Sequence, residues 1–556
     1  MNAERLLAHY EKIADAPDAI PRLRRFVLDL AVRGKLVPQD QNDEPAQSRM
    51  RASSSADGPF GLPFSWVWVN VGSVADTRLG KMLDKVKNKG IPRPYLRNIN
   101  VRWFDFDLSD LLQMLFEEEE LTELALRAGD VMICEGGEPG RAAVWDQRAD
   151  NVYFQKAIHR VRFNPIVDPA FFVKALRASA DDGRLAEYFT GTGIKHFTGK
   201  SLNTYLFPLP PLTEQHRIVA KVDELMALCD RLEAARAERE ATRDRLTAAS
   251  LARLSATDPD TFSGDARFAL DALPALTARP DQIKQLRQTI LNLAVRGKLV
   301  PRDPNDESAS VQIARVADAK SVGKGRKGAR AKGLPNNADR SDESLPTGWT
   351  SVRLDDLAIS MHYGTSIKCG YDADQTPVLR IPNVSSGRVV LDDLKYGPLS
   401  DRDREALTLE AGDLLMIRSN GSLDIVGRSA VVTPEAEGMA FAGYLVRLHT
   451  LKDQTDTRYI WLALNSGSVR EQIEHPIRSA VGLKNVNLTE FGNLSFWLPP
   501  LAEQHRIVAK VDELMALCDR LEASLTTADE TRRRLLESLL AEALAPDEER
   551  ELEAAE

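Results

Sequence analysis

Cysteine is scarce in this sequence: the 556 residues contain only Cys134, Cys229, Cys369 and Cys518. No two have the spacing of a metal clip or a disulfide framework, so we expect small core residues in a reducing compartment. No apolar run approaches the ~20 residues that a membrane helix needs. The first ten residues also lack the charged head and apolar stretch of a signal peptide. These absences predict a cytoplasmic protein with no membrane segment.

Aromatic residues are also few, at 6%, but 43% hydrophobic and 28% charged residues are ordinary globular usage and exclude a disordered or collagen-like chain. The length suits three or four domains. The net charge of −9 argues at face value against nucleic-acid binding. However, residues 540–556 hold seven acidic residues against one basic residue, which leaves the remainder nearly neutral. A neutral domain can still present a basic face, so charge alone leaves nucleic-acid binding open.

Catalytic signatures are missing as well. The sequence contains no Gly-x4-Gly-Lys-Ser/Thr phosphate loop, so we expect no ATP on this chain. Its Pro-Pro pairs occur only in Leu-Pro-Pro-Leu, whereas an adenine amino-methyltransferase would have Asn-Pro-Pro followed by an aromatic residue. Asp130, Glu135 and Glu138 could form an acidic nuclease cluster, but Arg418 and Ser419 occupy the comparable part of the second half. We therefore expect no catalytic residue.

Histidine offers little more. His216 and His505 each stand next to a Glu-Gln pair near a predicted helix start, but no second histidine or cysteine is nearby. A helix-start or partner-contact role is therefore favoured over a metal ligand or a base, and we expect no metal site.

The sequence contains two internal repeats, one long and one short. LPPLTEQHRIVAKVDELMALCDRLEA (Leu209–Ala234) recurs at Leu498–Ala523 with one difference, Thr213 against Ala502. LAVRGKLVP also occurs twice, starting at residues 30 and 293, and isolated matches in between align the two intervening regions. Each half therefore runs from a short helix through a linker and a globular domain to a long helix.

The long repeat has helical periodicity. Ile218, Val222, Leu225, Cys229 and Leu232 follow at spacings of four, three, four and three. The roughly 40 residues of such a helix would span roughly 60 Å. One apolar stripe per helix suggests that the two helices pack against each other, antiparallel if a pseudo-two-fold axis relates the halves.

The regions between the repeats look like mixed α/β domains. In the first, we expect strands at 67–71, 131–134, 142–145 and 158–163 and helices at 169–179 and 182–189. In the second, we expect strands at 414–417, 429–432 and 445–449 and a helix at 457–466. The predicted fold is α+β, with two mixed α/β domains separated by two long antiparallel repeated helices.

The predicted organisation has eight segments. They are an N-terminal helical segment (1–45), the first globular domain (60–208), a central helix (209–255), a repeat of the N-terminal segment (268–307), a flexible basic linker (308–344), the second globular domain (345–497), a distal helix (498–545) and an acidic tail (546–556).

The two halves differ in an informative way: their long helices are nearly identical even at polar positions that we expect to face solvent, whereas their globular domains have diverged. An identical surface shown twice suggests one partner bound twice, and two unlike domains suggest two different recognised features. A recent exchange of sequence between the two helix segments is the alternative. The polar positions offered to a partner are Glu214, Gln215, Arg217 and Lys221, with Glu503, Gln504, Arg506 and Lys510.

This arrangement resembles the specificity subunit of a Type I restriction-modification system. The resemblance rests on the two repeats and on AGDVMICEGGEPGRAAV (128–144) and AGDLLMIRSNGSLDIVGRSAVV (411–432), and it covers nearly the whole chain. The Leu-Pro-Pro-Leu-x-Glu-Gln-His-Arg-Ile-Val helix start, present twice, is highly specific, whereas the Ala-Gly-Asp turn alone would be weak.

The resemblance implies a non-catalytic subunit with two target-recognition domains, each reading one half of a split, asymmetric site in double-stranded DNA. It also implies two modification subunits, which hold S-adenosylmethionine and methylate adenine, and restriction and translocase subunits, which use ATP and Mg. No cofactor is expected on this chain. Half-sites one helical turn apart, roughly 34 Å, lie within the reach of the predicted helices.

Candidate DNA contacts are polar and basic residues in the domains, since base edges are read by such side chains and phosphates attract positive charge. Each is weighed against a solvated charge or a structural role. The recurring Arg-x-x-Asn pairs at 97 and 380 suit a shared backbone contact or a shared structural role better than sequence-specific reading. The candidates are Lys81, Lys85, Lys87, Arg97, Asn100, Lys195 and Lys200 in the first domain and Arg380, Asn383, Arg418, Ser419, Asn420, Lys484 and Asn485 in the second.

Two other functions are weighed against this one. A coiled-coil adaptor joining protein partners without DNA suits the neutral to acidic domains, but the motifs favour the DNA-reading subunit. The third possibility is an enzyme fused to its own specificity domain, but this chain has neither the catalytic motifs nor the length for a catalytic domain. Affinity for DNA that falls with added salt would separate the first two.

Overall fold

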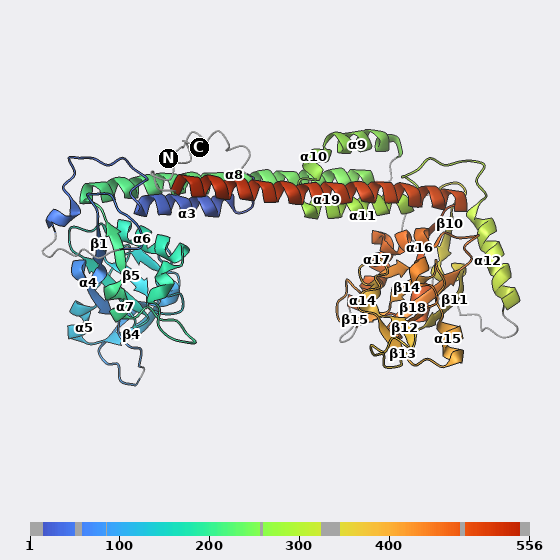
Figure 1. The fold of residues 1–556 in the computed structure, drawn as a ribbon, viewed down its shortest axis with the longest axis horizontal. Coiled ribbons are helices and arrows are strands. Elements are labelled where there is room, and N and C mark those ends of the chain that lie inside the picture. Colours follow the sequence, from blue (N-terminus) through green and yellow to red (C-terminus); the bar gives the residue numbers. More distant parts are fainter. Residues whose placement is uncertain are drawn as a thin grey trace. The chain divides into compact units, whose positions relative to one another are not determined.

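The protein is described by a computed structural model, which covers residues 15–49, 58–84, 86–255, 259–323, 345–478 and 484–544. The chain divides into two compact units, one comprising Met1–Arg239 with Ala528–Glu556 and the other Glu240–Thr527. Each unit contains one sheet-bearing domain and a part of each of two long helices (Figure 1).

The first domain is built on a four-stranded antiparallel sheet in the order β2-β8-β5-β6. A three-stranded sheet in the order β4-β3-β7 and the antiparallel pair β1-β9 accompany it. The strands are β1 Val67–Asn70, β2 Ala75–Leu79, β3 Ile91–Leu96, β4 Leu112–Phe116, β5 Val131–Cys134, β6 Ala142–Val144, β7 Tyr153–Phe154, β8 Ile158–Phe163 and β9 Leu206–Leu209.

The central strand β5 explains how this sheet is held. Its four side chains are all buried, and they alternate between two cores because successive strand residues point to opposite faces. Val131 and Ile133 belong to one apolar cluster, whereas Met132 and Cys134 belong to another. The free cysteine is therefore a core residue, as the sequence predicted.

Short helices surround the sheets: α4 Val71–Val74, α5 Glu118–Glu123, α6 Pro169–Asp181 and α7 Gly199–Thr204. Asp168 caps α6 by accepting a hydrogen bond from the Ala170 amide at 2.8 Å. Four predicted elements of this domain differ from the structure at their ends. Two differ slightly, because the strand expected over 142–145 ends at Val144 and the helix expected over 169–179 runs to Asp181. The strand expected over 67–71 ends at Asn70, whose side chain caps α4, and the helix expected over 182–189 is a 3-10 turn, Arg184–Tyr188.

The second domain repeats the plan. Its four-stranded sheet has the order β11-β18-β14-β16, its three-stranded sheet the order β13-β12-β17, and β10 pairs with β20. The small pair β15-β19 is an addition. The strands are β10 Thr350–Arg353, β11 Ala358–Tyr363, β12 Thr376–Leu379, β13 Lys395–Gly397, β14 Leu414–Ile417, β15 Ser419–Asn420, β16 Ser429–Val431, β17 Ala440–Phe441, β18 Leu445–Thr450, β19 Lys484–Asn485 and β20 Ser495–Leu498.

The helices of this domain are α13 Leu354–Leu357, α14 Ile381–Val384, α15 Asp401–Leu407, α16 Thr457–Asn465, α17 Gly467–Arg478 and α18 Leu488–Gly492. As in the first domain, the central strand divides its side chains between two cores: Leu414 and Met416 lie in one and Leu415 and Ile417 in the other. The two domains therefore share one fold although few of their residues match.

The two long helices form as predicted, as α8 Leu212–Ser255 and α19 Leu501–Leu544. In the first unit, α3 (Ala19–Val32) lies against both of them. Arg24 pairs with Asp230 of α8 at 2.7 Å, and Ala16 and Ala19 pack on Leu536 and Leu539 of α19.

The order of these contacts gives the directions of the helices. Asp15 pairs with Arg239, so α3 runs antiparallel to α8, whereas the Leu544 carbonyl accepts a hydrogen bond from Lys35, so α3 runs along α19. The two long helices are thus antiparallel, as predicted.

In the second unit, α11 (Pro280–Val295) takes the place of α3, as expected for its repeat. Arg279 pairs with Glu240 of α8 at 2.8 Å, and Arg287 pairs with Asp519 of α19 at 2.7 Å. Two further helices, α9 Pro259–Asp271 and α10 Leu273–Leu276, pack on the end of α8 through Leu251 and Leu254.

The apolar stripe of α8 begins against its own domain and not, as we expected, against the other long helix. Ile218 and Val222 are buried in a cluster with Val27 and Leu28 of α3 and Phe171 of α6. The reason is local: α8 leaves the domain directly after β9, so the nearest apolar surfaces are those of α3 and α6.

The first part of the segment expected as a basic linker over 308–344 is helical, which corrects that part of the prediction. This part forms α12, Ala309–Gly323, which is anchored by the fully buried Ala309 and Val316. The rest of that segment and the predicted acidic tail lie outside the described residues. No helix in the described part of the chain is long and apolar enough to cross a membrane.

Candidate partner and nucleic-acid interface

The polar residues at the start of each long helix turn inward, which corrects the expectation that they face solvent. Glu214 and Glu503 are at most 1% exposed. Glu214 accepts hydrogen bonds from the Trp66 indole at 3.0 Å and from Gln39 at 2.6 Å. Glu503 accepts one from the Trp349 indole, also at 3.0 Å. Burial raises the pKa of both carboxyl groups above the ordinary value.

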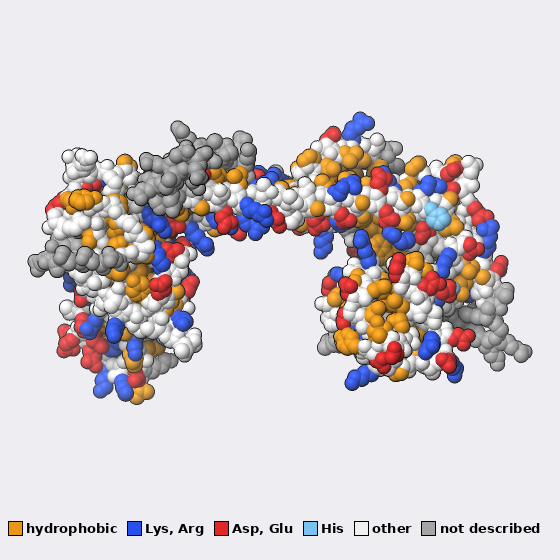
Figure 2. All heavy atoms as spheres, viewed as in Figure 1, with side chains coloured by type: hydrophobic (Ala, Val, Ile, Leu, Met, Phe, Trp, Pro, Cys, Tyr) orange, Lys and Arg blue, Asp and Glu red, His pale blue; other side chains and the backbone are white. Residues whose placement is uncertain are grey.

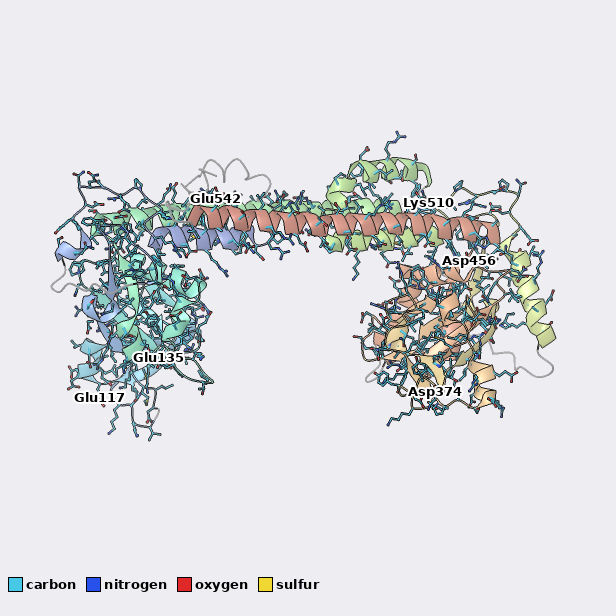
Figure 3. The ribbon with its side chains drawn as sticks, viewed as in Figure 1. Glu117, Glu135, Asp374, Asp456, Lys510 and Glu542 are labelled. Carbon is cyan, nitrogen blue, oxygen red and sulfur yellow. The ribbon has the colours of Figure 1, made fainter. Side chains whose placement is uncertain are left out.

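The neighbouring glutamines are also internal. Gln215 accepts a hydrogen bond from the Asp168 amide at 2.7 Å, and Gln504 accepts one from the Asp456 amide at 2.9 Å. Each glutamine thereby ties the N-terminus of α6 or α16 to a long helix; Figure 3 labels Asp456 beside α19. Both are completely buried, so neither can meet a partner protein.

The repeated arginine, Arg217 or Arg506, binds the segment that precedes each domain. Arg217 pairs with Asp43 at 2.6 Å, and Arg506 pairs with Asp306 at 2.7 Å. Hydrogen bonding from Arg217 lowers the pKa of Asp43. Asp43 and its copy Asp306 therefore have a structural role, and intrachain packing explains much of the identity that we had assigned to a shared partner.

A smaller part of the repeated helix remains open. Glu224, Leu228 and Arg231 are exposed and lie at helical spacing on one face of α8, and Glu513, Leu517 and Arg520 are their copies on α19. Leu228 is 43% exposed and Leu517 40%. Lys221 and Lys510, which we predicted as partner contacts, border this face through pairs with Glu224 and Glu513, both at 2.9 Å (Figure 3 labels Lys510). The sequence feature that could have indicated this face is Leu228, with its copy Leu517, because it is a leucine outside the apolar stripe of its helix.

The recurring Arg-x-x-Asn pairs are structural. Asn100 and Asn383 are at most 2% exposed and hydrogen-bond to nearby backbone groups, so they cannot contact DNA. Arg97 pairs with Asp110 at 2.6 Å, and Arg380 pairs with Asp393 at 2.9 Å. These four candidates brace the turn after β3 or β12.

The lysine candidates of the first domain divide into two groups. Lys81 is engaged, because it pairs with Glu120 and its ammonium lies 5.3 Å from the centre of the Phe116 ring. Lys87 makes only a long ion pair with Asp84, at 3.9 Å, and 85% of its side chain is exposed. Lys195 and Lys200 are exposed too. Lys85 lies outside the described residues.

In the second domain, the structure gathers most candidates in one place. Arg418 follows β14 directly, and its guanidinium lies 4.3 Å from the centre of the Tyr363 ring. Ser419 pairs with Asn485, and Asn420 with Lys484, across the β15-β19 ladder. Ser419 is nearly buried, whereas Asn485 is exposed.

The acidic residues of the Ala-Gly-Asp turns pair with arginines of their own domain and so hold the fold. Asp130 is 1% exposed and pairs with Arg162 at 2.7 Å, and Asp413, fully buried, pairs with Arg447 at 2.6 Å. The described residues contain no cluster of three His, Cys, Asp or Glu side chains that could hold a metal ion. On the face shown in Figure 2, basic and acidic side chains are mixed over both domains.

These features define a class: two unlike domains of one fold, each leading into a copy of the same long helix. The family described as the Type I restriction modification DNA specificity domain matches the chain twice, over residues 65–240 and 346–528. Since the two matches cover well over half of the chain, it belongs to this family.

Relatives of known name match over nearly the full length. The EcoEI specificity subunit of the Type I restriction enzyme from Escherichia coli is 27% identical, over 94% of both chains. The EcoAI specificity subunit from the same organism is 26% identical, over 94% of this chain and 93% of that one. A chain from a solved structure of complex assembly in the type I R-M system has a TM-score of 0.50 and 19% identity, and it covers 88% of this chain and 100% of that one. This last similarity supports the fold alone.

Proposed function

We propose that this protein is the DNA specificity subunit of a Type I restriction-modification complex, with no catalysis of its own. The observation that carries the proposal is the duplication: two domains of one fold but unlike surfaces, each joined to a long helix whose first half is nearly identical in the two copies. Each domain reads one half of a split, asymmetric site in double-stranded DNA.

Two modification subunits dock on the exposed parts of the repeated helices. A surface that occurs twice with the same residues suits two copies of one partner, because the same patch on each copy can bind it. Leu228 with Glu224 and Arg231, and their copies, supply an apolar centre and a charged rim, the usual composition of a protein interface.

The cofactors belong to the other subunits. S-adenosylmethionine is held by the modification subunits and ATP with Mg by the restriction and translocase subunits, and the complex acts in the cytoplasm. This assignment agrees with the lack of a phosphate loop and of an amino-methyltransferase motif in the sequence.

DNA binding is tested with the chain in complex with its modification subunit and a labelled duplex that carries the recognised site. Neutralised phosphates release counterions, so the affinity is expected to fall linearly on a logarithmic scale as salt rises, by about 0.9 decades per decade of salt for each contacted phosphate. An adaptor that joins only proteins would add no preference for one duplex over another, so an unlabelled duplex with the site would compete no better than a duplex without it. Equal affinity for all duplexes would therefore contradict the proposal.

A further inference from the structure

One position of the shared fold carries opposite charges in the two domains. In the first domain it is Glu135, the residue directly after β5. Its amide donates a hydrogen bond to the Ala157 carbonyl at 2.8 Å, and its carbonyl accepts one from the Phe197 amide at 2.7 Å. Two backbone bonds therefore hold this residue between the turn before β8 and the segment that leads to α7.

In the second domain the same position is Arg418, directly after β14. Its amide donates to the Tyr444 carbonyl at 3.0 Å, and its carbonyl accepts from the Val486 amide at 2.8 Å. Because both backbone bonds recur, the two residues occupy equivalent places, and only their side chains differ.

The carboxylate of Glu135 is little used by the fold. Its side chain is 20% exposed, and the group facing it is the imidazole of His196, with Nδ1 at 3.7 Å. The nearby Glu138 pairs with Arg141, whereas no described residue donates a hydrogen bond to the Glu135 carboxylate. Figure 3 labels Glu135 within the first domain.

The guanidinium of Arg418 is equally unused. It lies over the Tyr363 ring, and its Nε is buried with no hydrogen-bond partner. No described carboxylate or carbonyl accepts from this guanidinium, in contrast to Arg380 of the same domain, which binds both the carboxylate and the carbonyl of Asp393. Stacking on the ring fixes the plane of Arg418, and the two terminal NH2 groups, unlike the buried Nε, remain for an acceptor outside the chain.

We propose that Glu135 and Arg418 are the equivalent specificity-determining residues of the two domains; this rests on the proposed function. Arg418 donates to O6 and N7 of a guanine, and Glu135 accepts from the N4 amino group of a cytosine, both in the major groove. A guanidinium only donates and a carboxylate only accepts. The same place on the fold therefore demands opposite base edges, which makes the two half-sites unlike.

The test uses the full chain with its modification subunit in a host free of other adenine methylation, with methylated adenines mapped by single-molecule sequencing. Arg418→Ala is expected to remove the requirement for guanine at one position of one half-site, with discrimination reduced roughly 5- to 150-fold. Glu135→Gln is expected to relax one cytosine position of the other half-site. In each case the remaining half-site stays unchanged.

Matched controls come from exposed residues of like charge in the same domains, Arg402→Ala on α15 and Glu118→Gln on α5, which should leave both half-sites intact. Arg418→Lys should relax the guanine position almost as much as alanine does, because an ammonium cannot form the bidentate contact.

Unchanged half-sites with both Arg418→Ala and Glu135→Gln, beside a clear wild-type motif, would overturn this inference and leave the proposed function standing. If the wild-type complex methylated no split motif, the proposed function would fail instead. A variant that assembles normally but does not methylate is tested by competition binding with four duplexes, each with a different base pair at the position in question. If Arg418→Ala still prefers guanine there, the inference is overturned.

Discussion

The buried glutamates at the helix starts make a residue-scale prediction. Glu214→Ala leaves the Trp66 indole, itself 3% exposed, without its acceptor. An unsatisfied buried donor costs about 1–3 kcal/mol, so we expect the free energy of unfolding to fall by that amount in urea denaturation. Glu503→Ala should behave in the same way through Trp349. The control Glu224→Ala removes only an exposed pair and should stay within about 0.5 kcal/mol; an equal loss in the control would contradict the assignment.

Asp413 predicts a dependence of stability on pH. Burial raises its pKa, but hydrogen bonds from His449 and the Glu410 amide and the charge of Arg447 outweigh that effect and bring the pKa below its ordinary value of 3.8. The folded state therefore holds the charged form more strongly than the unfolded chain does. Its contribution is fully present above pH about 5 and is lost as the pH falls through 3.8 toward the folded pKa.

The measurement compares urea midpoints of the wild type and Asp413→Asn between pH 3 and pH 7. We expect the difference to be largest at neutral pH and to shrink on acidification. A difference that is constant across this range would show that the charge of Asp413 is not responsible.

Local sequence pattern could not foretell these contacts. Glu214 looks like a solvent-facing helix residue because it follows the Pro-Pro turn, yet its partners Trp66 and Gln39 precede it by 148 and 175 residues. The sequence did show that the repeats are identical at positions off the apolar stripe. That identity has two explanations, packing within the chain and a shared partner surface, and the sequence does not separate them. Only the fold separates Glu214 from Leu228.

At the scale of elements, periodicity predicted the most. The apolar spacing placed the long helices within three residues of α8 and α19, and alternation or short apolar runs located β5, β8 and β14. The order of the strands could not be predicted, because strands that pair can lie far apart in the sequence. In β2 and β8, for example, Asp76 accepts a hydrogen bond from the side chain of Arg160, 84 residues later. The linker was predicted from the glycines and basic residues that follow residue 320. Its first part forms α12 instead, and this helix, with its buried Val316, packs against the domain.

The exposed helix faces make an element-scale prediction. Leu228→Asp places a charge at the centre of one of the two docking faces, so we expect the complex to hold one modification subunit in place of two. Leu517→Asp should do the same at the other face, and the double variant should bind none. Native mass spectrometry measures this stoichiometry.

Its control is Ala227→Ser, a small change at an exposed neighbour on α8 that should leave two subunits bound. Two subunits retained by the double leucine variant, with unchanged helix content by circular dichroism, would place the docking surface elsewhere.

At the scale of the whole molecule, the duplication predicts separable reading. Replacement of residues 95–200 by the matching segment of a relative is expected to change one half-site and to preserve the other, because each domain has its own sheet and its own cores. Methylation mapping of the chimaera in complex with the modification subunit measures the outcome. A simultaneous change in both half-sites would contradict two independent readers.

The most direct test of the central claim is a map of methylated adenines in a methylation-free host that expresses the unaltered chain with its modification subunit. We predict a split, asymmetric motif of fixed spacing that disappears when this chain is omitted. A stable complex that methylates no such motif, or a motif that persists without this chain, would contradict its role as the DNA-reading subunit.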